Sequence, residues 1–275
     1  MWPLSRPKAE EILRIGRHAV ERWKAVDGSL AQVSAHALLQ DTSPHPQRLA
    51  EAVSTLYASA PALPITLVLE SAWVPVMLVD TGAALLRSAQ VDALVRHRFG
   101  LHHSDSLDPV GAWDLRIEYR AGSRCALAYG MPPGLKQTLI DAGRAAGLEW
   151  VAMTPALAWG MERLRIAKRW PRTPGWFLWP EQDRTLVARV AANEVVGFNP
   201  GAASASDETT LKRLVDAECA RLGIDSTTDP IAAARWYSVL RAARAGDRFA
   251  WLDLSEQGSP LATPAKPTPP ARVSA

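Results

Sequence analysis

The chain has 275 residues, of which 48% are hydrophobic and 21% are charged. This length and apolar content suffice for one large or two medium folded domains. The formal net charge of +3 arises from 31 basic and 28 acidic residues spread along the sequence. The clustered basic stripe of a nucleic-acid binder is therefore missing, and nucleic acid is excluded as the expected partner.

The sequence also predicts a cytoplasmic protein. Its first residues contain no apolar core of the kind that a secretion signal needs. The longest apolar stretch, residues 63–86, is interrupted by two prolines and two acidic residues, which is typical of buried strands and not of a membrane span. The two cysteines, Cys125 and Cys219, have no CxxC spacing, which argues against a disulfide framework and against a zinc site.

The N-terminal region predicts two or three short strands followed by a helix. Apolar and polar residues alternate over 11–23 and 29–39, with turn signals at Gly16 and at the Asp27-Gly28 pair. Apolar residues recur at helical spacing between about His45 and Ala58. Two extended runs follow: a continuous β-branched run typical of a strand buried on both faces, and a second one directly after it, at residues 64–69 and 74–79.

The middle of the chain predicts an α/β insertion. In chain order we expect a helix, a polar loop, a hairpin of two strands, a helix, a strand and a helix, at residues 85–99, 100–111, 113–120 with 125–131, 132–147, 149–153 and 155–165. A basic connection follows, at residues 163–172.

The pattern of the N-terminal region then returns. Three short strands and a helix are predicted from the segments GWFLWP, RTLVARVAA, EVVGFNP and DETTLKRLVDAECARLGI, which begin at residue 175 and end at residue 224. Residues 229–245 are amphipathic and predict a helix, with an extended alternative at 236–239, and residues 249–254 predict a last strand. Residues 255–275 are rich in proline, serine and alanine, so we expect a disordered tail.

A β-β-β-α unit used twice predicts an α/β fold of the actin and sugar-kinase type, built from two ribonuclease-H-like halves around an α/β insertion. The expected divisions are a first half, an insertion, a second half and a tail, at residues 1–84, 85–148, 149–254 and 255–275. Folds of this type usually hold ATP between the halves, so the turns that face the phosphates decide what the cleft binds.

Those turns carry the wrong residues for a phosphate. Nucleotide binders of this fold use turns rich in Gly and small hydroxyl residues after an Asp, whose backbone N–H groups face the phosphates while the carboxylate positions Mg²⁺. The first turn, residues 14–18, has Gly16 but no Asp. The second, residues 179–184, has no Gly, and there Pro180 removes a donor N–H while Glu181 repels phosphate. The sequence therefore predicts no cofactor, and a nucleotide-binding ATPase related to actin or the sugar kinases is kept as an alternative.

The string Val79-Asp80-Thr81-Gly82-Ala83 resembles the catalytic loop of retropepsin-like aspartic proteases. Such enzymes need two aspartates that share one proton. The chain has no second copy of the string, so catalysis by Asp80 would require a dimer. An ordinary Asp-Thr-Gly turn is the other interpretation, and Asp80 is the single candidate catalytic residue of this alternative.

Two further patterns are weaker. Adjacent histidines in a polar loop point to opposite sides, so His102 and His103 are a poor start for a metal site with Asp105 and Asp108, and no metal is predicted. Ser71 lacks the Gly-x-Ser-x-Gly elbow of a serine hydrolase.

Tryptophan is unusually frequent, with 11 residues against 4 Phe and 4 Tyr. The indole N–H needs a hydrogen-bond partner when it is buried, so we expect several tryptophans at domain seams or surface grooves, where exposed ones could anchor a partner. Ordinary aromatic core positions are the alternative interpretation.

Three segments carry a resemblance to a known family: LPITLVLESAWVPVMLVD, ALAYGMPPGLKQTLIDAGRAAGLEWVAMTPALAWGMERL and GWFLWPEQDRTLVARVAANEVVGF. Together they resemble the actin-like cytoplasmic proteins of the type IV pilus platform and the cytoplasmic domain of the type II secretion L-protein, over roughly residues 11–254. In that family an Ala-Gly-Leu-Glu connector and a strand lead to Pro-Ala-Leu-Ala, which here are residues 146–149 and 155–158.

The resemblance implies a protein partner in a groove between subdomains, either a cytoplasmic segment of an inner-membrane protein or an assembly ATPase. The chain departs from the family in lacking the Asp-Ile-Gly and Asp-x-Gly turns of the pilus member, and in lacking a membrane-spanning helix after the core. These features together predict a non-catalytic scaffold at the inner face of the membrane, attached to it through another chain.

Overall fold

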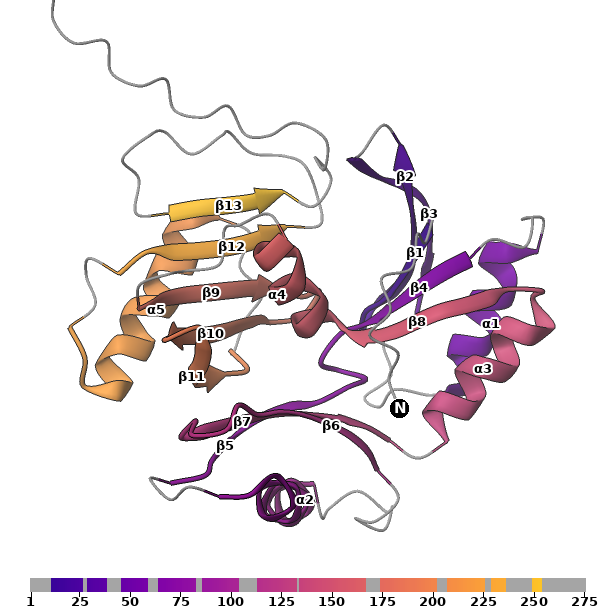
Figure 1. The fold of residues 1–275 in the computed structure, drawn as a ribbon. Helices are drawn as coiled ribbons and strands as arrows, with labels where there is room; N and C mark the ends of the chain where they lie inside the picture. The colour runs from indigo at the N-terminus through magenta and orange to yellow at the C-terminus, as the bar shows by residue number, and fades with distance from the viewer. Residues whose placement is uncertain are drawn as a thin grey trace, which may run out of the picture.

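The computed structural model describes residues 11–26, 29–38, 46–58, 64–82, 86–103, 113–132, 134–166, 174–201, 207–225, 229–235 and 249–253. Within these residues the chain forms two five-stranded sheets and one three-stranded sheet (Figure 1). None of the helices among them is long and apolar enough to cross a membrane.

The first large sheet has the strand order β3-β2-β1-β4-β8. Its strands are β1 (Glu11–Ile15), β2 (Ala19–Val26), β3 (Ser29–Ala37), β4 (Pro64–Leu69) and β8 (Glu149–Pro155). The first three strands pair antiparallel, and β4 pairs parallel with both β1 and β8. Two helices, α1 (Pro46–Tyr57) and α3 (Leu135–Ala145), pack on each other at the outer side of this sheet (Figure 1).

The second large sheet repeats the plan in the order β11-β10-β9-β12-β13. Its strands are β9 (Gly175–Pro180), β10 (Thr185–Ala191), β11 (Glu194–Asn199), β12 (Ile231–Arg235) and β13 (Phe249–Asp253). Again three antiparallel strands are followed by parallel pairing, and α5 (Glu208–Leu222) lies between β11 and β12 in the chain. Asp207 begins α5 by accepting a hydrogen bond from the Thr210 N–H, and Gly223 ends it in the left-handed conformation.

Each large sheet has a β-bulge between its second and third strands. The pairing of β2 with β3 shifts register at Arg22/Trp23, and the pairing of β10 with β11 shifts at Arg189/Val190. The extra residues are Val33 and Val196, and both are exposed valines. The second bulge lies two residues further from its turn than the first. The repeated strand order confirms that the β-β-β-α unit is duplicated, as the sequence predicts.

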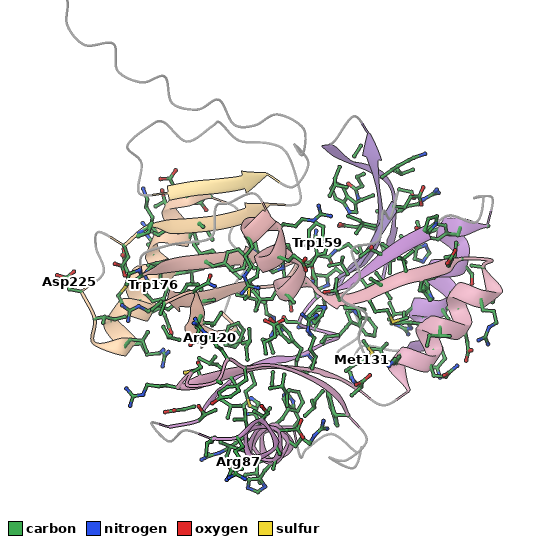
Figure 2. The ribbon with its side chains drawn as sticks, in the orientation of Figure 1. Arg87, Arg120, Met131, Trp159, Trp176 and Asp225 are labelled. Carbon is green, nitrogen blue, oxygen red and sulfur yellow. The ribbon has the colours of Figure 1, made fainter. Side chains whose placement is uncertain are left out.

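The insertion is the small sheet β5-β7-β6 with α2 (Ser88–His102) on its outer face (Figure 1). Its strands are β5 (Val76–Asp80), β6 (Asp114–Glu118) and β7 (Cys125–Met131). Figure 2 shows Arg87 beside α2 at the far side of this layer, and Trp159 on α4 (Ala156–Ile166) between the large sheets.

The sheet pairing differs from the predicted boundaries in three elements. β5, expected at the end of the first half, pairs with β7 of the insertion. β8, expected to open the second half, pairs with β4 of the first. α3, expected in the insertion, packs on α1, because a crossover helix is what allows β8 to run parallel to β4.

Another prediction is wrong for residues 231–235. The amphipathic pattern over 229–245 predicts a helix, but β12 forms a strand that runs parallel to both β9 and β13. Its alanines favour a helix in isolation, and the pairing of a central strand overrides that preference. Residues 236–248 and the expected tail lie outside the described residues.

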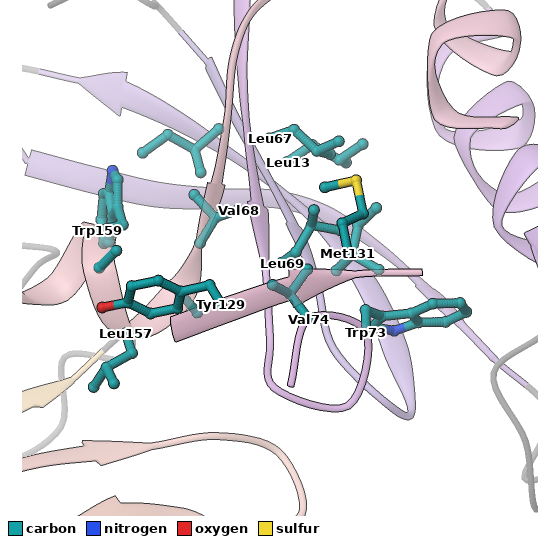
Figure 3. Close-up of a cluster of buried hydrophobic side chains, with 14 of the residues drawn as sticks. Leu13, Leu67, Val68, Leu69, Trp73, Val74, Tyr129, Met131, Leu157 and Trp159 are labelled. Atoms are coloured by element: carbon teal, nitrogen blue, oxygen red, sulfur yellow. The ribbon is translucent and has the colours of Figure 1, made fainter. Parts of the chain in front are cut away.

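One continuous core joins the first half, the insertion and the second half. Leu67 and Leu69 of β4, Tyr129 and Met131 of β7 and Trp159 of α4 all belong to this core (Figure 3). The same core cluster contains side chains of the second sheet, including Phe177 and Trp179. A second cluster lies under α5, and a third lies between α2 and the small sheet.

The third cluster generates a stability prediction. A Cβ atom on Gly130 of β7 would lie 2.1 Å from the ring of Phe99 on α2. We expect Gly130→Ala to lower the free energy of unfolding by about 1–3 kcal/mol, because the extra carbon overpacks the contact between α2 and the small sheet. Urea denaturation measures the change. Gly197→Ala is the control, since its nearest contact would be 3.2 Å away, and an equal loss in both variants would contradict the prediction.

Candidate functional site

The two turns that face the cleft of an actin-like fold meet each other here. The first joins β1 to β2 and is closed by the Gly16 N–H donating to the Ala19 carbonyl at 3.0 Å. The second joins β9 to β10 and is closed by the Glu181 N–H donating to the Arg184 carbonyl at 2.7 Å. Both turns lie where the sequence predicts them. They occupy equivalent positions in the two copies of the β-β-β-α unit.

Gln182 crosses from the second turn into the first. Its side-chain oxygen accepts hydrogen bonds from the His18 N–H at 2.7 Å and the Ala19 N–H at 3.0 Å, and its Nε2 donates to Glu21 at 3.2 Å. A Cβ atom on Gly16 would lie 2.2 Å from the Gln182 side chain. Glycine at this position therefore makes room for a side chain of the same protein.

A reciprocal exchange of hydrogen bonds lies next to Gln182. Glu181 accepts from the Ser71 N–H at 2.8 Å and pairs through its second oxygen with the Ser71 hydroxyl. Glu70, the residue before Ser71, accepts from the Gln182 N–H at 3.2 Å. Each half thus offers a carboxylate to a backbone N–H of the other half.

Arg14 lies beneath this exchange and is 2% exposed. Its guanidinium group forms ion pairs with Glu70 and, at 3.1 Å, with Glu21. Two tryptophans complete the surroundings: Trp23 donates to Glu21 at 3.2 Å, and Trp73 donates to the Gly16 carbonyl at 2.9 Å. Burial of an ion pair requires this kind of support, because an unpaired charge in the interior is costly.

The rim of the contact is more exposed. Arg17 pairs with Asp183 at 2.9 Å across the two turns, and Arg184 pairs with the same carboxylate at 3.0 Å. We refer to the whole contact as the latch. It comprises Arg14, Arg17, Glu21, Glu70, Ser71, Glu181, Gln182, Asp183 and Arg184.

Burial perturbs the acids of the latch. It raises the pKa of Glu181 to about 8, with a further increase from the nearby Glu70 carboxylate, while hydrogen bonds from Ser71 and the charge of Arg14 oppose the shift. Burial also raises the pKa of Glu70 against the opposing effect of Arg14. At Asp183 burial acts in the same direction, but hydrogen bonds from Arg184 and Arg17 outweigh it and lower the pKa.

The latch residues do not fit a nucleotide. The backbone N–H groups of His18 and Ala19 already donate to Gln182, so they do not offer themselves to a phosphate. Three buried carboxyl groups, on Glu21, Glu70 and Glu181, lie beside these donors, and each of them that is ionised would repel a phosphate. Arg14 holds two of them from below and has little surface to present to a ligand.

Asp80 lies at the end of β5, away from the latch. Its side chain is exposed and accepts a hydrogen bond from the Gly82 N–H at 2.7 Å. Thr81 donates to the Ser123 carbonyl at 3.1 Å. These bonds are those of an ordinary Asp-Thr-Gly turn, and catalysis by a pair of such aspartates stays an untested alternative.

The other candidate residues from the sequence do not come together at one site. Ser71 belongs to the latch, where its hydroxyl faces Glu181. His103 stacks on Trp113 with ring centroids 5.4 Å apart, and His102 is exposed. Asp105 and Asp108 lie outside the described residues. No group of histidines, cysteines and acids that could hold a metal occurs in the part of the chain that the structure describes.

Most tryptophans of the described residues are buried. Trp23, Trp73, Trp159 and Trp179 are buried, and all four belong to the core shared by the halves. They occupy core positions, as the alternative interpretation expects, and a place at a seam between domains stays a prediction. The expectation of exposed anchors is wrong for the described tryptophans whose burial is known, since Trp113 and Trp176 are also buried and Trp150 is half-buried.

Sequence reasoning missed the latch as a constellation. It identified the turns and the unsuitability of Glu181, but not the roles of Arg14, Glu70 and Gln182. A usable signal was present: Arg14 and Glu70 occur within or directly after runs of apolar residues, where a charge needs a buried partner.

Comparison with known proteins supports the fold. No family model and no curated protein sequence matches the chain. Solved structures with a similar fold include a Bacteroides thetaiotaomicron protein of actin-like ATPase fold and unknown function, at 8% identity and a TM-score of 0.50 over 83% of this chain and 82% of that one. The chain therefore has an actin-like fold, as predicted.

Two further similar structures are the cytoplasmic domain of EpsL, an inner-membrane component of the type II secretion system of Vibrio cholerae, and the PilM-PilN type IV pilus biogenesis complex. The first is 13% identical with a TM-score of 0.48, over 88% of this chain and 87% of that one. The second is 13% identical with a TM-score of 0.46, over 80% of this chain and 67% of that one.

Removal of Gln182 tests how firmly the latch joins the halves. We expect Gln182→Ala to lower the free energy of unfolding by about 2–3 kcal/mol, because the His18 and Ala19 N–H groups lose their acceptor. Arg17→Ala, which removes an exposed ion pair of the same contact, should cost about 0–1 kcal/mol. Chemical denaturation compares the two variants, and equal costs would show that Gln182 contributes no more than a surface contact.

Proposed function

We propose that the chain is a non-catalytic scaffold or adaptor of a type IV pilus or type II secretion-like platform at the inner face of the inner membrane. In this proposal it binds the cytoplasmic segment of a membrane protein and needs no cofactor. The single observation that carries the non-catalytic part is the latch, in which Gln182 occupies the hydrogen-bond donors of the turn that would otherwise face a phosphate.

The latch supports binding in preference to catalysis for a mechanical reason. An actin-like ATPase hydrolyses its nucleotide in a cleft that must admit a ligand and change shape around it. Here the equivalent turns are joined by direct hydrogen bonds and by the ion pair of Arg17 with Asp183, and further hydrogen bonds link the second turn to Glu70 and Ser71. Opening the contact would expose several charged groups together, so the halves present a preorganised surface to a partner.

The assignment to a pilus or secretion platform has a separate basis. It rests on the sequence resemblance over residues 63–80, 126–164 and 175–198, and on the actin-like fold. Attachment to the membrane through a partner follows from that resemblance and stands as part of the proposal.

The nucleotide part of the proposal is tested by calorimetry. Titration of the full chain with ATP and Mg²⁺ up to millimolar concentration should give no binding heat, because Gln182 already occupies the backbone N–H groups of His18 and Ala19. Gln182→Ala is the matched variant, since it frees those donors while the carboxylates remain. Stoichiometric binding of ATP to the wild-type chain with micromolar affinity would refute the proposal that the chain binds no nucleotide.

The partner part is tested by sedimentation with inner-membrane vesicles from cells that encode the chain. We expect the chain to sediment with these vesicles and to lose that binding after protease removes the segments on their cytoplasmic face. Vesicles of the extracted lipids alone should not bind. Equal binding to the lipid vesicles, or no binding to either kind, would contradict a membrane-protein partner.

A further inference from the structure

Strand β3 is an uncharged edge of the first large sheet. It ends the strand order β3-β2-β1-β4-β8, and among the described strands it pairs with β2 alone. An edge strand presents backbone N–H and C=O groups with which another strand can pair, and proteins commonly protect such edges with charged side chains. The sequence of β3, SLAQVSAHA, contains no Asp, Glu, Lys or Arg. β3 therefore lacks protection by charge.

The other edge strands that the structure describes do carry charge. Strands β5, β6, β8, β11 and β13 each have at least one acidic residue, and these are Asp80, Asp114, Glu118, Glu149, Glu194 and Asp253. β11, which is the equivalent of β3 in the second half, also contacts β5 and β7 of the insertion. In the second half this edge is thus charged and covered by the insertion, whereas β3 is uncharged and ends its sheet.

One hydrogen bond shows which backbone groups of β3 face outward. The Leu38 N–H donates to the His18 carbonyl at 2.7 Å, so Leu38 faces β2. Successive residues of an antiparallel strand direct their N–H and C=O groups alternately to one neighbouring strand and to the other. His36 therefore faces β2 as well, while Ala35 and Ala37 direct their N–H and C=O groups to the free edge.

This part of β3 is complementary to itself. Antiparallel pairing about His36 places Ala35 of one strand opposite Ala37 of the other at two positions, and each of these pairs exchanges two hydrogen bonds. Both alanines are exposed and small, so no like charges lie opposite each other. The bulge at Val33 confines the regular pairing to the residues that follow it.

We propose that β3 is a self-association edge, at which two copies of the chain pair their β3 strands antiparallel about His36 and join their first sheets into one. The two-fold axis of such a pair is perpendicular to the sheet. Helix α1, which contacts β3, therefore lies on the same face of the joined sheet in both copies. This inference concerns self-association and does not depend on which membrane protein the chain binds.

Sedimentation velocity of the full-length chain over a range of concentrations tests the proposal. We expect a concentration-dependent equilibrium between monomer and dimer. Ala35→Lys combined with Ala37→Lys should weaken dimerisation about tenfold or more, because lysines then lie opposite each other at both alanine pairs. Ala35→Lys combined with Ala37→Glu is the matched control. Each lysine then lies opposite a glutamate, so this variant should dimerise about as well as the wild-type chain.

The two double variants separate the proposed pairing from association through another surface. They change the same two positions and differ only in the charge that lies opposite Lys at position 35. Equal dimerisation of the two variants, whether retained or lost in both, would overturn the proposal. A wild-type chain that stays monomeric at every concentration would overturn it as well.

Hydrogen exchange of the wild-type chain covers the case in which a double variant does not fold. The Ala35 and Ala37 N–H groups should be protected in the dimer and lose that protection when the chain is diluted to the monomer. The Leu38 N–H, which donates to the His18 carbonyl, should stay protected in both states. Protection of all three N–H groups in the monomer would show that the same chain covers the edge. Protection of Ala35 and Ala37 that arises only with inner-membrane vesicles would assign the edge to a partner strand, and either result would overturn the proposal.

Discussion

The buried ion pair of Arg14 with Glu70 holds a carboxylate that accepts a hydrogen bond from the second half. The Arg14 guanidinium group is buried between carboxylates of β2 and of the turn after β4, and one of these carboxylates accepts a backbone N–H from the second half. A buried charge of either sign is tolerated only with its partners in place, and removal of one partner typically costs about 3–5 kcal/mol. Both ion pairs lie within the first half, so they hold Glu70 in place to accept the Gln182 N–H of the second half.

The latch resembles, in protein groups alone, the contents of a nucleotide cleft. The carboxamide oxygen of Gln182 accepts from two successive N–H groups of a turn, as a phosphate oxygen would. The guanidinium group of Arg14 lies among acids, as a divalent cation would. In the proposed scaffold, these internal contacts take the place of a nucleotide between the halves.

The hydrophobic core is continuous between the two halves. The hydrophobic cluster runs from β1 and β4 through β7 and α4 to β9, so the insertion and both halves share one interior. Tryptophan suits such a position because it fills a large volume and its N–H can bond a polar group at the joint. Trp73 does this at the Gly16 carbonyl, and Trp23 at the Glu21 carboxylate.

The sequence by itself determined the repeated unit, the turns and most of the elements. Alternation and turn chemistry act over a few residues, so the strands at 11–26 and 175–199 and the helices at 46–57 and 208–222 could be predicted locally. The unsuitability of Glu181 for a phosphate was also visible, since it follows from charge alone. Only the tertiary structure decided that β5 and β8 join other sheets than expected, and that residues 231–235 form a strand. It also brought Glu181 to Ser71 and Gln182 to Gly16 across more than a hundred residues, because such contacts depend on how the halves pack and leave no periodic trace in the sequence.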